Sequence, residues 1–581
     1  MLYIQYHNKY SYIHKKKQFS VSKNTVGSFT SLFVYINQYI DIMCKRLFRR
    51  KVLMSNLISV AIQNKTNLLG DDEIFLTLIG TDEAGQQCFG KIVDGLVTWV
   101  SVDPVYPLGR YNYKLSNIAA SLKIMPIKAA RLYFSLRYCL NWCLDTSKSP
   151  YCIVEPDGFN PRDTNYYILY DKIEFTFNGN KAWINPTAVD FFSLPLQIAI
   201  DSGKQAGFTL PRQTICNNIN TILDDALQTQ SPDIATSWAS LFLSFVPQNK
   251  NGANCLLRIM SPAKAMQYVP KQSTFSSAYC DSFIEFLWSY YAQQGNKLAI
   301  DCTVLSNDAN FNPKLNDYIF VGTVIGNNFI FTNSNREQTV TISKISTFSL
   351  FTGTQGSLEF PNHTIGAIIA QTLAAAFTVG ALPADNAAIL NKDYFAKMKA
   401  NNLYYTSNHL APQGIWYDLY SKMLHKAQTD VDFYSFAYDD LLSQDGTLII
   451  DSNNQISVTI GDMSNTNIPN PYADPNLYNV VINVGEALDE KFYEVQINDR
   501  IIFPDRAYMN YNVSSPLTLY IEKEKVVIYL NPTIILPADN AIAANIVVEL
   551  RSGNVVAINI PAPPTKSFWN TLCGFVKNWF N

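Results

Sequence analysis

Alternation of apolar and polar residues predicts a half-buried strand at 171–178. The run from 173 to 178 is Ile-Glu-Phe-Thr-Phe-Asn. Side chains on a strand point alternately to opposite faces, so the apolar set packs into a core and Glu174, Thr176 and Asn178 share the other face. The pair Asn178-Gly179 then predicts a hairpin, because both residues tolerate the positive φ angles of a tight turn.

The hairpin brings an aromatic side chain beside the acid in either of two registers. With Asn178 and Gly179 as the loop, Trp183 lies opposite Glu174; with the loop shifted by one residue, it lies opposite Thr176. Both registers place the indole on the face of Glu174. An acid, a hydroxyl, an amide and a flat ring on one face are suited to holding a sugar next to a proton donor. The alternative is an ordinary solvated sheet face.

Asp190 stands in the apolar run AVDFFSLPL, from 188 to 196. An ionised carboxylate among apolar groups is costly unless it is paired or its pKa moves, and such acids gather at functional sites. A functional carboxylate is one interpretation; an Asp that caps a turn or pairs with an Arg is the other.

The rest of the chain predicts several domains. Short strands at 57–62, 74–79, 96–100 and 130–136 favour a β-sandwich or barrel. Helical periodicity at 219–227, 282–291 and 365–376, with strands near 297–349, indicates a mixed α/β unit. After a strand at 456–460, the sequence NIPNP from 467 has the composition of a linker before further short strands. The expected units are an extension or misassigned start at 1–53, a β domain at 54–200 with a return segment at 430–466, a mixed α/β domain at 201–429, a β-sandwich-like domain at 467–562 and an amphipathic tail helix at 563–581.

Composition excludes some classes of protein. Charged residues make up 16% of the 581 residues, the net charge is −2, and the body of the chain has no dense Lys/Arg stripe, which argues against a nucleic-acid partner. No stretch is a convincing transmembrane helix, so we expect no integral membrane segment; the tail is either a membrane-surface helix or a docked terminal helix.

The ten cysteines have no paired CxxC spacing and are too sparse for a disulfide framework, so free buried thiols are expected. Cys139, Cys143 and Cys152 are near enough in sequence for one bridge. With only five His residues, we expect no metal site and no cofactor.

The motifs RLYFS at 131–135, YSFAYDD at 434–440, and a strand Glu followed sixteen residues later by the Asp of VDFFSLP carry a family resemblance. Together they resemble glycoside hydrolase family 64, the endo-β-1,3-glucanases with a thaumatin-like barrel, over about 57–462. The resemblance implies a multidomain, β-rich fold: a thaumatin-like β-barrel or sandwich and a mixed α/β domain that together form a cleft, with a separate small C-terminal β domain.

The resemblance also implies inverting hydrolysis, with Glu174 as general acid and Asp190 as general base. Further residues would line the groove, namely Asp163, Thr176, Asn178, Trp183, Thr187, Asp439 and Asp440. Thr187 and Asp190 have opposite faces in strict alternation, so a bulge or turn is needed between them. Ala437 replaces the proline that is more usual in the family, which affects loop rigidity rather than chemistry.

The expected partner is β-1,3-glucan, and the expected oligomeric state is a monomer. Members of the family are typically exported, which favours an extracellular location, although no clear signal peptide precedes the β domain. The alternative is a non-catalytic thaumatin-like protein that binds glucan or acts as a toxin. The C-terminal β domain is either a carbohydrate-binding module or a structural or partner-binding sandwich.

Overall fold

A computed structural model describes residues 57–468, apart from 103–110, 146, 161–162, 164, 229, 246–254, 268–274, 304–317, 407, 429–431 and 453; between 477 and 560 it describes only the course of the strands. The expected extension at 1–53, residues 469–471 of the expected linker at 467–471 and the tail helix at 563–581 lie outside these residues.

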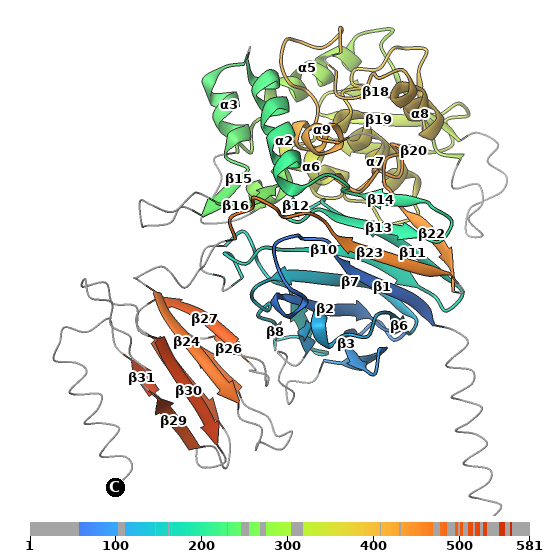
Figure 1. Ribbon diagram of the computed structural model, residues 1–581. Coiled ribbons are helices and arrows are strands. Elements are labelled where there is room, and N and C mark those ends of the chain that lie inside the picture. Colours follow the sequence, from blue (N-terminus) through green and yellow to red (C-terminus); the bar gives the residue numbers. More distant parts are fainter. Residues whose placement is uncertain are drawn as a thin grey trace, which may run out of the picture. The chain divides into compact units, whose positions relative to one another are not determined.

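A single large sheet dominates the first part of the chain (Figure 1). Its strands run in the order β14-β13-β23-β1-β6-β4-β3-β2-β7-β10-β11-β22, with β5 paired to β2. They are β1 (Ile58–Asn64), β2 (Ile74–Thr81), β3 (Gln87–Val93), β4 (Leu96–Ser101), β5 (Tyr113–Lys114), β6 (Leu122–Ile124), β7 (Ile127–Leu136), β10 (Tyr170–Phe177), β11 (Lys181–Pro186), β13 (Leu196–Ile200), β14 (Gln205–Gly207), β22 (Leu448–Asp451) and β23 (Gln455–Ile460).

The expected return segment completes this sheet. Strand β23, orange in Figure 1, lies between β1 and β13, parallel to β1 and antiparallel to β13. Strand β22 pairs with β11. Residues separated by almost 400 positions are therefore neighbours in one sheet, which a local sequence pattern does not specify.

The sheet curls into a nearly closed barrel. A Cβ added to Gly207 of β14 would lie 3.0 Å from Pro186 Cγ of β11, and Gly207 has a φ of +100° that favours glycine. The segment 432–434 spans this gap: Gly207 N donates to Asp432 O (3.0 Å), and Tyr434 N donates to Pro186 O (3.1 Å). The return segment thus connects the two strands that the curled sheet brings together.

Strand β10 has the two faces that its alternation predicts. Ile173, Phe175 and Phe177 are 0%, 7% and 1% exposed, whereas Glu174 and Thr176 are half-buried. Burial of the first three against the barrel core stabilises the strand, and each such side chain contributes roughly 1.5–3 kcal/mol.

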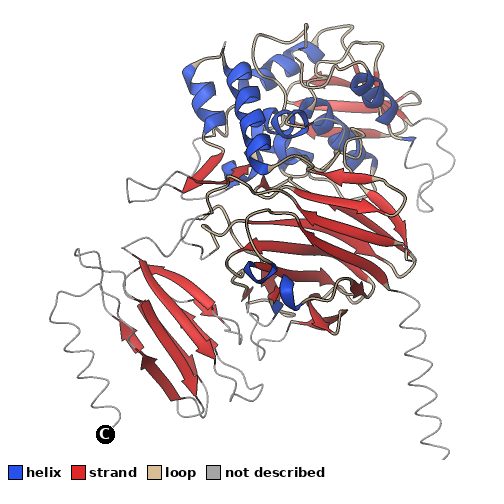
Figure 2. Ribbon diagram, in the orientation of Figure 1, coloured by secondary structure: helices blue, strands red, loops and turns tan. Residues whose placement is uncertain are grey.

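The α-helices and two smaller sheets lie between 191 and 426 (Figure 2). Strands β15 (Phe242–Phe245) and β16 (Cys255–Met260) form one sheet with β12 (Phe191–Phe192), and the other runs β20 (Thr339–Ser343), β19 (Asn328–Asn333), β18 (Ile319–Ile325), β17 (Leu298–Asp301) and β21 (Ile389–Leu390). The helices are α2 (Arg212–Leu227), α3 (Pro232–Ala239), α4 (Pro262–Gln267), α5 (Asp281–Ala292), α6 (Thr347–Thr352), α7 (Ile365–Thr378), α8 (Lys392–Ala400) and α9 (Leu419–Lys426). A short hairpin consists of β8 (Cys143–Asp145) and β9 (Cys152–Val154).

Helix α7 confirms the helix expected from the alanine-rich run. Thr364 caps it by accepting a hydrogen bond from Ala367 N (3.1 Å), which satisfies one of the free N–H groups of the first turn. Almost all of its small side chains are buried. A helix that is apolar on nearly every side is expected to lie inside a core, and α7 does so.

The C-terminal strands form two four-stranded sheets. One runs β27 (Met509–Ser514), β24 (Leu477–Val484), β30 (Asn545–Arg551) and β29 (Val527–Asn531); the other runs β26 (Arg500–Ile502), β25 (Glu494–Ile497), β28 (Leu517–Glu522) and β31 (Ile558–Ile560). Two antiparallel-rich sheets agree with the β character expected there, and the sandwich packing stays a prediction.

Three further observations concern the described residues alone. None of their eight cysteines, which include Cys139, Cys143 and Cys152, is in a disulfide. None of their helices has both the length and the hydropathy needed to cross a membrane. Within them, no three His, Cys, Asp or Glu side chains gather in a way that could hold a metal ion.

Candidate active site

The hairpin adopts the second of the two expected registers. Thr176 lies opposite Trp183, and Glu174 lies opposite Asn185. The first register is wrong, because the loop is Gly179-Asn180 rather than Asn178-Gly179. Gly179 supplies the positive φ (+92°) at the first loop position, as in a type II′ turn. The indole shares the face of Glu174, as both registers predict.

Asn178 closes the turn. Its Oδ1 accepts from Asn180 N (3.0 Å) and Lys181 N (2.9 Å), and the residue is exposed at the hairpin tip. Asn178 therefore stabilises the turn through its own side chain. Its side-chain nitrogen Nδ2 has no hydrogen-bond partner among the described residues.

Glu174 borders an open hollow of about 210 Å³, which we call the Glu174 hollow. Arg131 on β7 lies directly across the strand pair, and its Nε donates to Glu174 Oε1 (3.1 Å). In the described part of the chain, Oε2 has no partner. The hollow is lined by Ala129, Ala130, Arg131, Glu174, Phe175, Thr176, Trp183 and Asn185. One carboxyl oxygen is thus anchored, and the other is available to a ligand.

A second acid shares the same arginine. Arg131 also hydrogen bonds to Glu155, which directly follows β9, and the Tyr133 hydroxyl donates to the other Glu155 oxygen. Sequence reasoning missed Glu155, because it lies outside the strands and neighbours Arg131 only through the barrel. Arg131 and Tyr133 stand in the RLYFS motif, and their alternate spacing in a strand was the available signal for a shared face.

Asp190 lies in a bend between β11 and β12, where the chain leaves the large sheet. This bend supplies the break in alternation that Thr187 and Asp190 require. Its carboxylate pairs with two lysines: Lys172 Nζ is 2.7 Å from Oδ2, and Lys264 Nζ of α4 is 3.2 Å from Oδ1. The alternative of an arginine partner is wrong, because the partners are lysines.

The two lysines determine the charge state of Asp190. Burial alone would raise its pKa, but Lys172, and after it Lys264, hold the pKa of Asp190 well below its usual range. The group is therefore an ionised carboxylate throughout the neutral and mildly acidic range. Neither lysine stood out in the sequence, because each is an ordinary charge in its own segment and gains its role from the fold.

A second hollow, of about 200 Å³, surrounds Asp190, and we call it the Asp190 hollow. It is lined by Val189, Asp190, Ser261, Pro262, Ala263, Lys264, Gln267, Phe351, Thr352, Thr354, Gln355, Asp418, Ser435, Phe436 and Ala437. These residues come from the β11–β12 connection, from the helices α4 and α6 and from the return segment. Polar and aromatic groups are mixed in it, as in sites that bind small polar ligands.

Lys172 lies between the two carboxylates in the network of contacts. It is on the same face of β10 as Glu174, two residues away, which separates their Cα atoms by about 7 Å. Its ammonium group interacts electrostatically with both Asp190 and Glu174. The fold therefore brings the two acids of the sequence hypothesis to one lysine, although each borders its own hollow.

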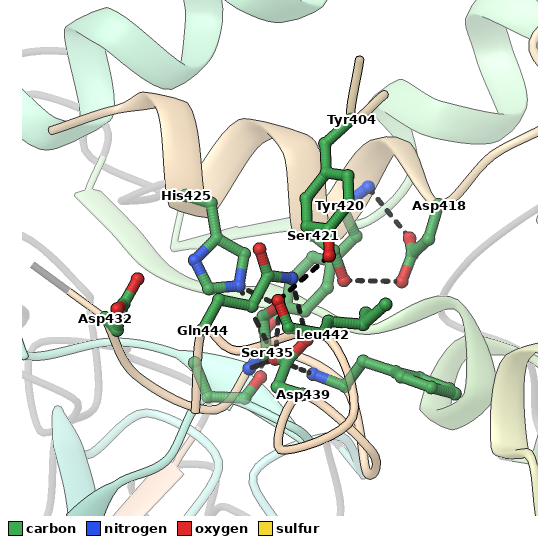
Figure 3. Close-up of polar contacts among 12 residues, drawn as sticks. Tyr404, Asp418, Tyr420, Ser421, His425, Asp432, Ser435, Asp439, Leu442 and Gln444 are labelled. Atoms are coloured by element: carbon green, nitrogen blue, oxygen red, sulfur yellow. Dashed lines mark hydrogen bonds and ion pairs between the residues drawn. The ribbon is translucent and has the colours of Figure 1, made fainter. Parts of the chain in front are cut away.

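Asp439 is fully buried and organises the return segment (Figure 3). Its Oδ2 accepts from Ser435 N (2.6 Å) and Phe436 N (2.9 Å), and its Oδ1 accepts from Gln444 Nε2 (2.8 Å). With 0% exposure it contacts the loop rather than a groove. Asp440, the next residue, is exposed.

Ser435, His425 and Asp439 lie together but do not form a nucleophilic triad (Figure 3). Ser435 Oγ is 2.8 Å from His425 Nε2, and Asp439 Oδ2 is 3.4 Å from the same nitrogen. A triad needs the serine and the carboxylate on different ring nitrogens. This cluster is instead a structural support for the loop that contributes to the Asp190 hollow.

Thr187 and Asp163 lie outside both hollows. Thr187 is 7% exposed and forms an isolated bridge with Tyr434 of the return segment. Asp163 Oδ1 accepts from the backbone and side-chain nitrogens of Asn165, both at 2.8 Å.

Two acids, each beside an open hollow, and a half-buried indole on the face of one of them are groups that a glycoside hydrolase can use. Residues 56–460 match the family model of glycoside hydrolase family 64, described as β-1,3-glucanase. This chain belongs to that family.

Two curated relatives are both glucan endo-1,3-beta-glucosidases, from Arthrobacter sp. (strain YCWD3) and from Cellulosimicrobium cellulans. Each is 25% identical over 304 residues, which is 52% of this chain and 47% of the relative. The chain therefore matches about half the length of these relatives.

Solved structures show the same fold. The β-1,3-glucanase domain from Clostridium beijerinckii is 20% identical, with a TM-score of 0.53, and is covered over 98% of its length by 70% of this chain. A laminaripentaose-producing β-1,3-glucanase in complex with laminaritetraose is 21% identical, also with a TM-score of 0.53, and is covered over 99% of its length by 70% of this chain.

Proposed function

We propose that this protein hydrolyses β-1,3-glucan at internal linkages, by an inverting mechanism with Glu174 as general acid and Asp190 as general base. The observation that carries the proposal is the Glu174 hollow, in which a half-buried carboxyl group with one unpaired oxygen stands on the same face as Trp183. Family membership and the names of the relatives support the reaction, and the relative in complex with laminaritetraose supports the substrate class.

The proposed acid has the geometry for proton donation. Arg131 fixes Oε1, so the carboxyl group has a defined orientation, while Oε2 is open to the glycosidic oxygen. Trp183 offers a flat apolar surface against which a sugar ring can stack. Thr176 and Asn185 supply polar groups in the same hollow. General acid catalysis of this kind typically accelerates a reaction by roughly 10²–10⁴-fold.

The proposed base, Asp190, must be ionised rather than protonated, and its surroundings differ from those of Glu174. A general base must be ionised, and the two lysines hold Asp190 in that state. Its side chain is 29% exposed and borders the Asp190 hollow, so a water molecule can reach the carboxylate. Lys172 beside both acids is consistent with the wider spacing of an inverting enzyme, in which a water molecule occupies the space in front of the base.

The remaining assignments are part of the same proposal. We infer that the barrel is a thaumatin-like domain and that the groove for glucan runs between it and the mixed α/β part, along the Asp190 hollow. Asp163, Asn178, Thr187 and Asp440 would contact more distant sugars, and Asp439 would act by holding the loop at 435–444. The monomeric state and the extracellular location stay predictions.

Incubation with laminarin, followed by a reducing-sugar assay, tests the activity. Oligosaccharides longer than glucose are expected early, because an endo-acting enzyme cuts within the chain. Saturable laminarin binding without product would instead favour a non-catalytic glucan-binding protein.

The stereochemistry of the first product tests the mechanism. Inverting enzymes hold their carboxyl groups about 6.5–9.5 Å apart and retaining enzymes about 5–5.5 Å apart. NMR should therefore show an α-anomer formed first from the β-linked substrate. A β-anomer formed first would contradict the assignment of Asp190 as base.

A further inference from the structure

Glu155 is joined to the proposed acid through a single arginine. Arg131 Nε donates to Glu174 Oε1 at 3.1 Å, and its terminal nitrogen donates to Glu155 Oε1. The side chains of Arg131, Glu155 and Glu174 are each about one-third exposed. Arg131 and Glu174 line the Glu174 hollow, and Glu155 reaches it only through its contact with Arg131. One guanidinium group thus serves two carboxylates.

Glu155 is itself held in place by a buried side chain. Its second oxygen accepts from the hydroxyl of Tyr133, which is 2% exposed and packs edge-on against Trp142, with ring centroids 5.2 Å apart. Burial, and next the Glu155 carboxylate, raise the pKa of Tyr133 well above its usual value, so the phenol remains a donor. With both oxygens engaged, Glu155 has a defined position on a rigid support.

The charges around Glu174 explain why a second acid is useful there. The cations that interact with Glu174 are Arg131 on β7 and Lys172 on β10, and Lys172 is already paired with Asp190. Lys181 of β11 and Asp451 of β22 share this face farther along, where they lie opposite each other at the hairpin end. On β11, the facing residues are the uncharged Asn185 and Trp183. A cation beside a carboxyl group favours loss of its proton, whereas a general acid must carry that proton. Glu155 is the acid in direct contact with this arginine that the proposed mechanism leaves unused.

We propose that Glu155 is a positioning residue that holds Arg131 and offsets its charge, so that Glu174 can carry a proton at the start of each catalytic cycle. This inference rests on the proposed function, because it takes Glu174 as the general acid. Glu155 need not contact the glucan: it acts on the acid through Arg131, and Tyr133 fixes it in place.

The test is the pH profile of kcat/KM on laminarin for Glu155→Gln. Loss of the Glu155 charge leaves Arg131 facing Glu174 alone, so the basic limb of the profile should move to lower pH by about half a unit to one unit. On that limb, activity at a fixed pH should fall about three- to tenfold. Glu155→Asp keeps the charge and should restore much of the profile. Tyr133→Phe, which frees one Glu155 oxygen, should move the limb in the same direction by less.

The matched control is Glu73→Gln. Glu73 is also paired with an arginine, Arg137, at 3.5 Å and with similar exposure, but Arg137 lines neither hollow, whereas Arg131 contacts Glu174. Its loss should leave the profile unchanged.

Two outcomes would overturn the inference. The first is a Glu155→Gln profile that superimposes on that of the unaltered protein, and the second is an equal loss at every pH that Glu155→Asp does not restore. Glu174→Gln, measured alongside, separates failure of the proposed function from failure of this inference. If Glu174→Gln keeps its activity, the proposed acid is wrong. If Glu174→Gln is inactive and the profile of Glu155→Gln is unshifted, only the role of Glu155 is refuted.

Discussion

The two carboxylates differ in what surrounds them. Glu174 stands on a regular strand, paired through one oxygen to an arginine that also binds Glu155. Asp190 lies in a bend, and each of its oxygens contacts a lysine. The first acid keeps a free oxygen beside an open hollow, and the second is held as an anion. Two acids sixteen residues apart thus have different environments, as the proposed roles of proton donor and proton acceptor require.

The largest expected effect comes from removing either carboxylate. Glu174→Gln and Asp190→Asn should each reduce kcat on laminarin by roughly 10²–10⁴-fold, because each removes one proton transfer from the reaction. Oligosaccharide binding, measured by calorimetry, should largely persist. Asp145→Asn, which removes another lysine-paired aspartate outside both hollows, is the control. Near-native turnover in either variant would remove that residue from the mechanism.

A third carboxylate, Asp439, is expected to affect the stability of the fold rather than the turnover of substrate. Asp439→Asn should lower the free energy of unfolding by about 3 kcal/mol, because a buried acceptor of several hydrogen bonds from N–H and O–H groups loses its charge. The adjacent, exposed Asp440→Asn should change it by less than about 0.5 kcal/mol. Urea denaturation measures both. Equal effects would mean that Asp439 does not support the loop.

Trp183, which lines the Glu174 hollow, gives the next largest expected effect. Trp183→Ala should weaken laminari-oligosaccharide binding about tenfold, equal to about 1.4 kcal/mol, with little change in Tm. Trp142→Ala is the contrast: that indole is 1% exposed, and its loss should cost about 3–5 kcal/mol of stability. If Trp183→Ala instead lowered Tm as much as Trp142→Ala, its ring would be a core element rather than a sugar platform.

The smallest effect tests the cations beside Asp190. Lys264→Met removes one charge that lowers the pKa of Asp190, so that pKa should rise and the base should be protonated at higher pH. The acidic limb of the kcat/KM profile should therefore move upward, by less than about one unit because Lys172 remains. Lys148→Met, which removes the surface partner of Asp145, should not move it. An unshifted or downward limb for Lys264→Met would contradict the ion-pair explanation.

The same lysines predict how stability depends on pH. The pKa of Asp190 is lower in the folded protein than in the unfolded chain. Its pairing therefore stabilises the fold above the unfolded pKa, and that contribution is lost as the pH falls toward the folded value. Asp190→Asn should consequently reduce the acid sensitivity of unfolding, even though it also removes activity.

The sequence by itself determined the strand at Glu174, its two faces and the position of Trp183 on the polar face. Those features depend on side-chain alternation and on turn residues, which act over a few positions. It determined less about the turn, because Asn178 and Gly179 allow two registers, and the hydrogen bonds of Asn178 Oδ1 to the turn accompany the second. The resemblance in the motifs indicated the family, which the match of residues 56–460 confirms, and the roles that it implies for the two acids stay a proposal.

Only the tertiary structure decided the partners of those acids. Lys264 reaches Asp190 from α4, Arg131 comes from β7, and Glu155 follows β9; each lies between nineteen and seventy-four positions from the acid it contacts, directly or through Arg131. The return segment joins the barrel from more than 220 positions away, through bonds such as Tyr434 N to Pro186 O. Local structural propensity carries no information about contacts between residues so far apart in the chain, since a lysine or an arginine is compatible with any solvated face. Folding of the sheet and of the helices beside it brought these charges together, and the ionised state of Asp190 follows from the two lysines placed next to it.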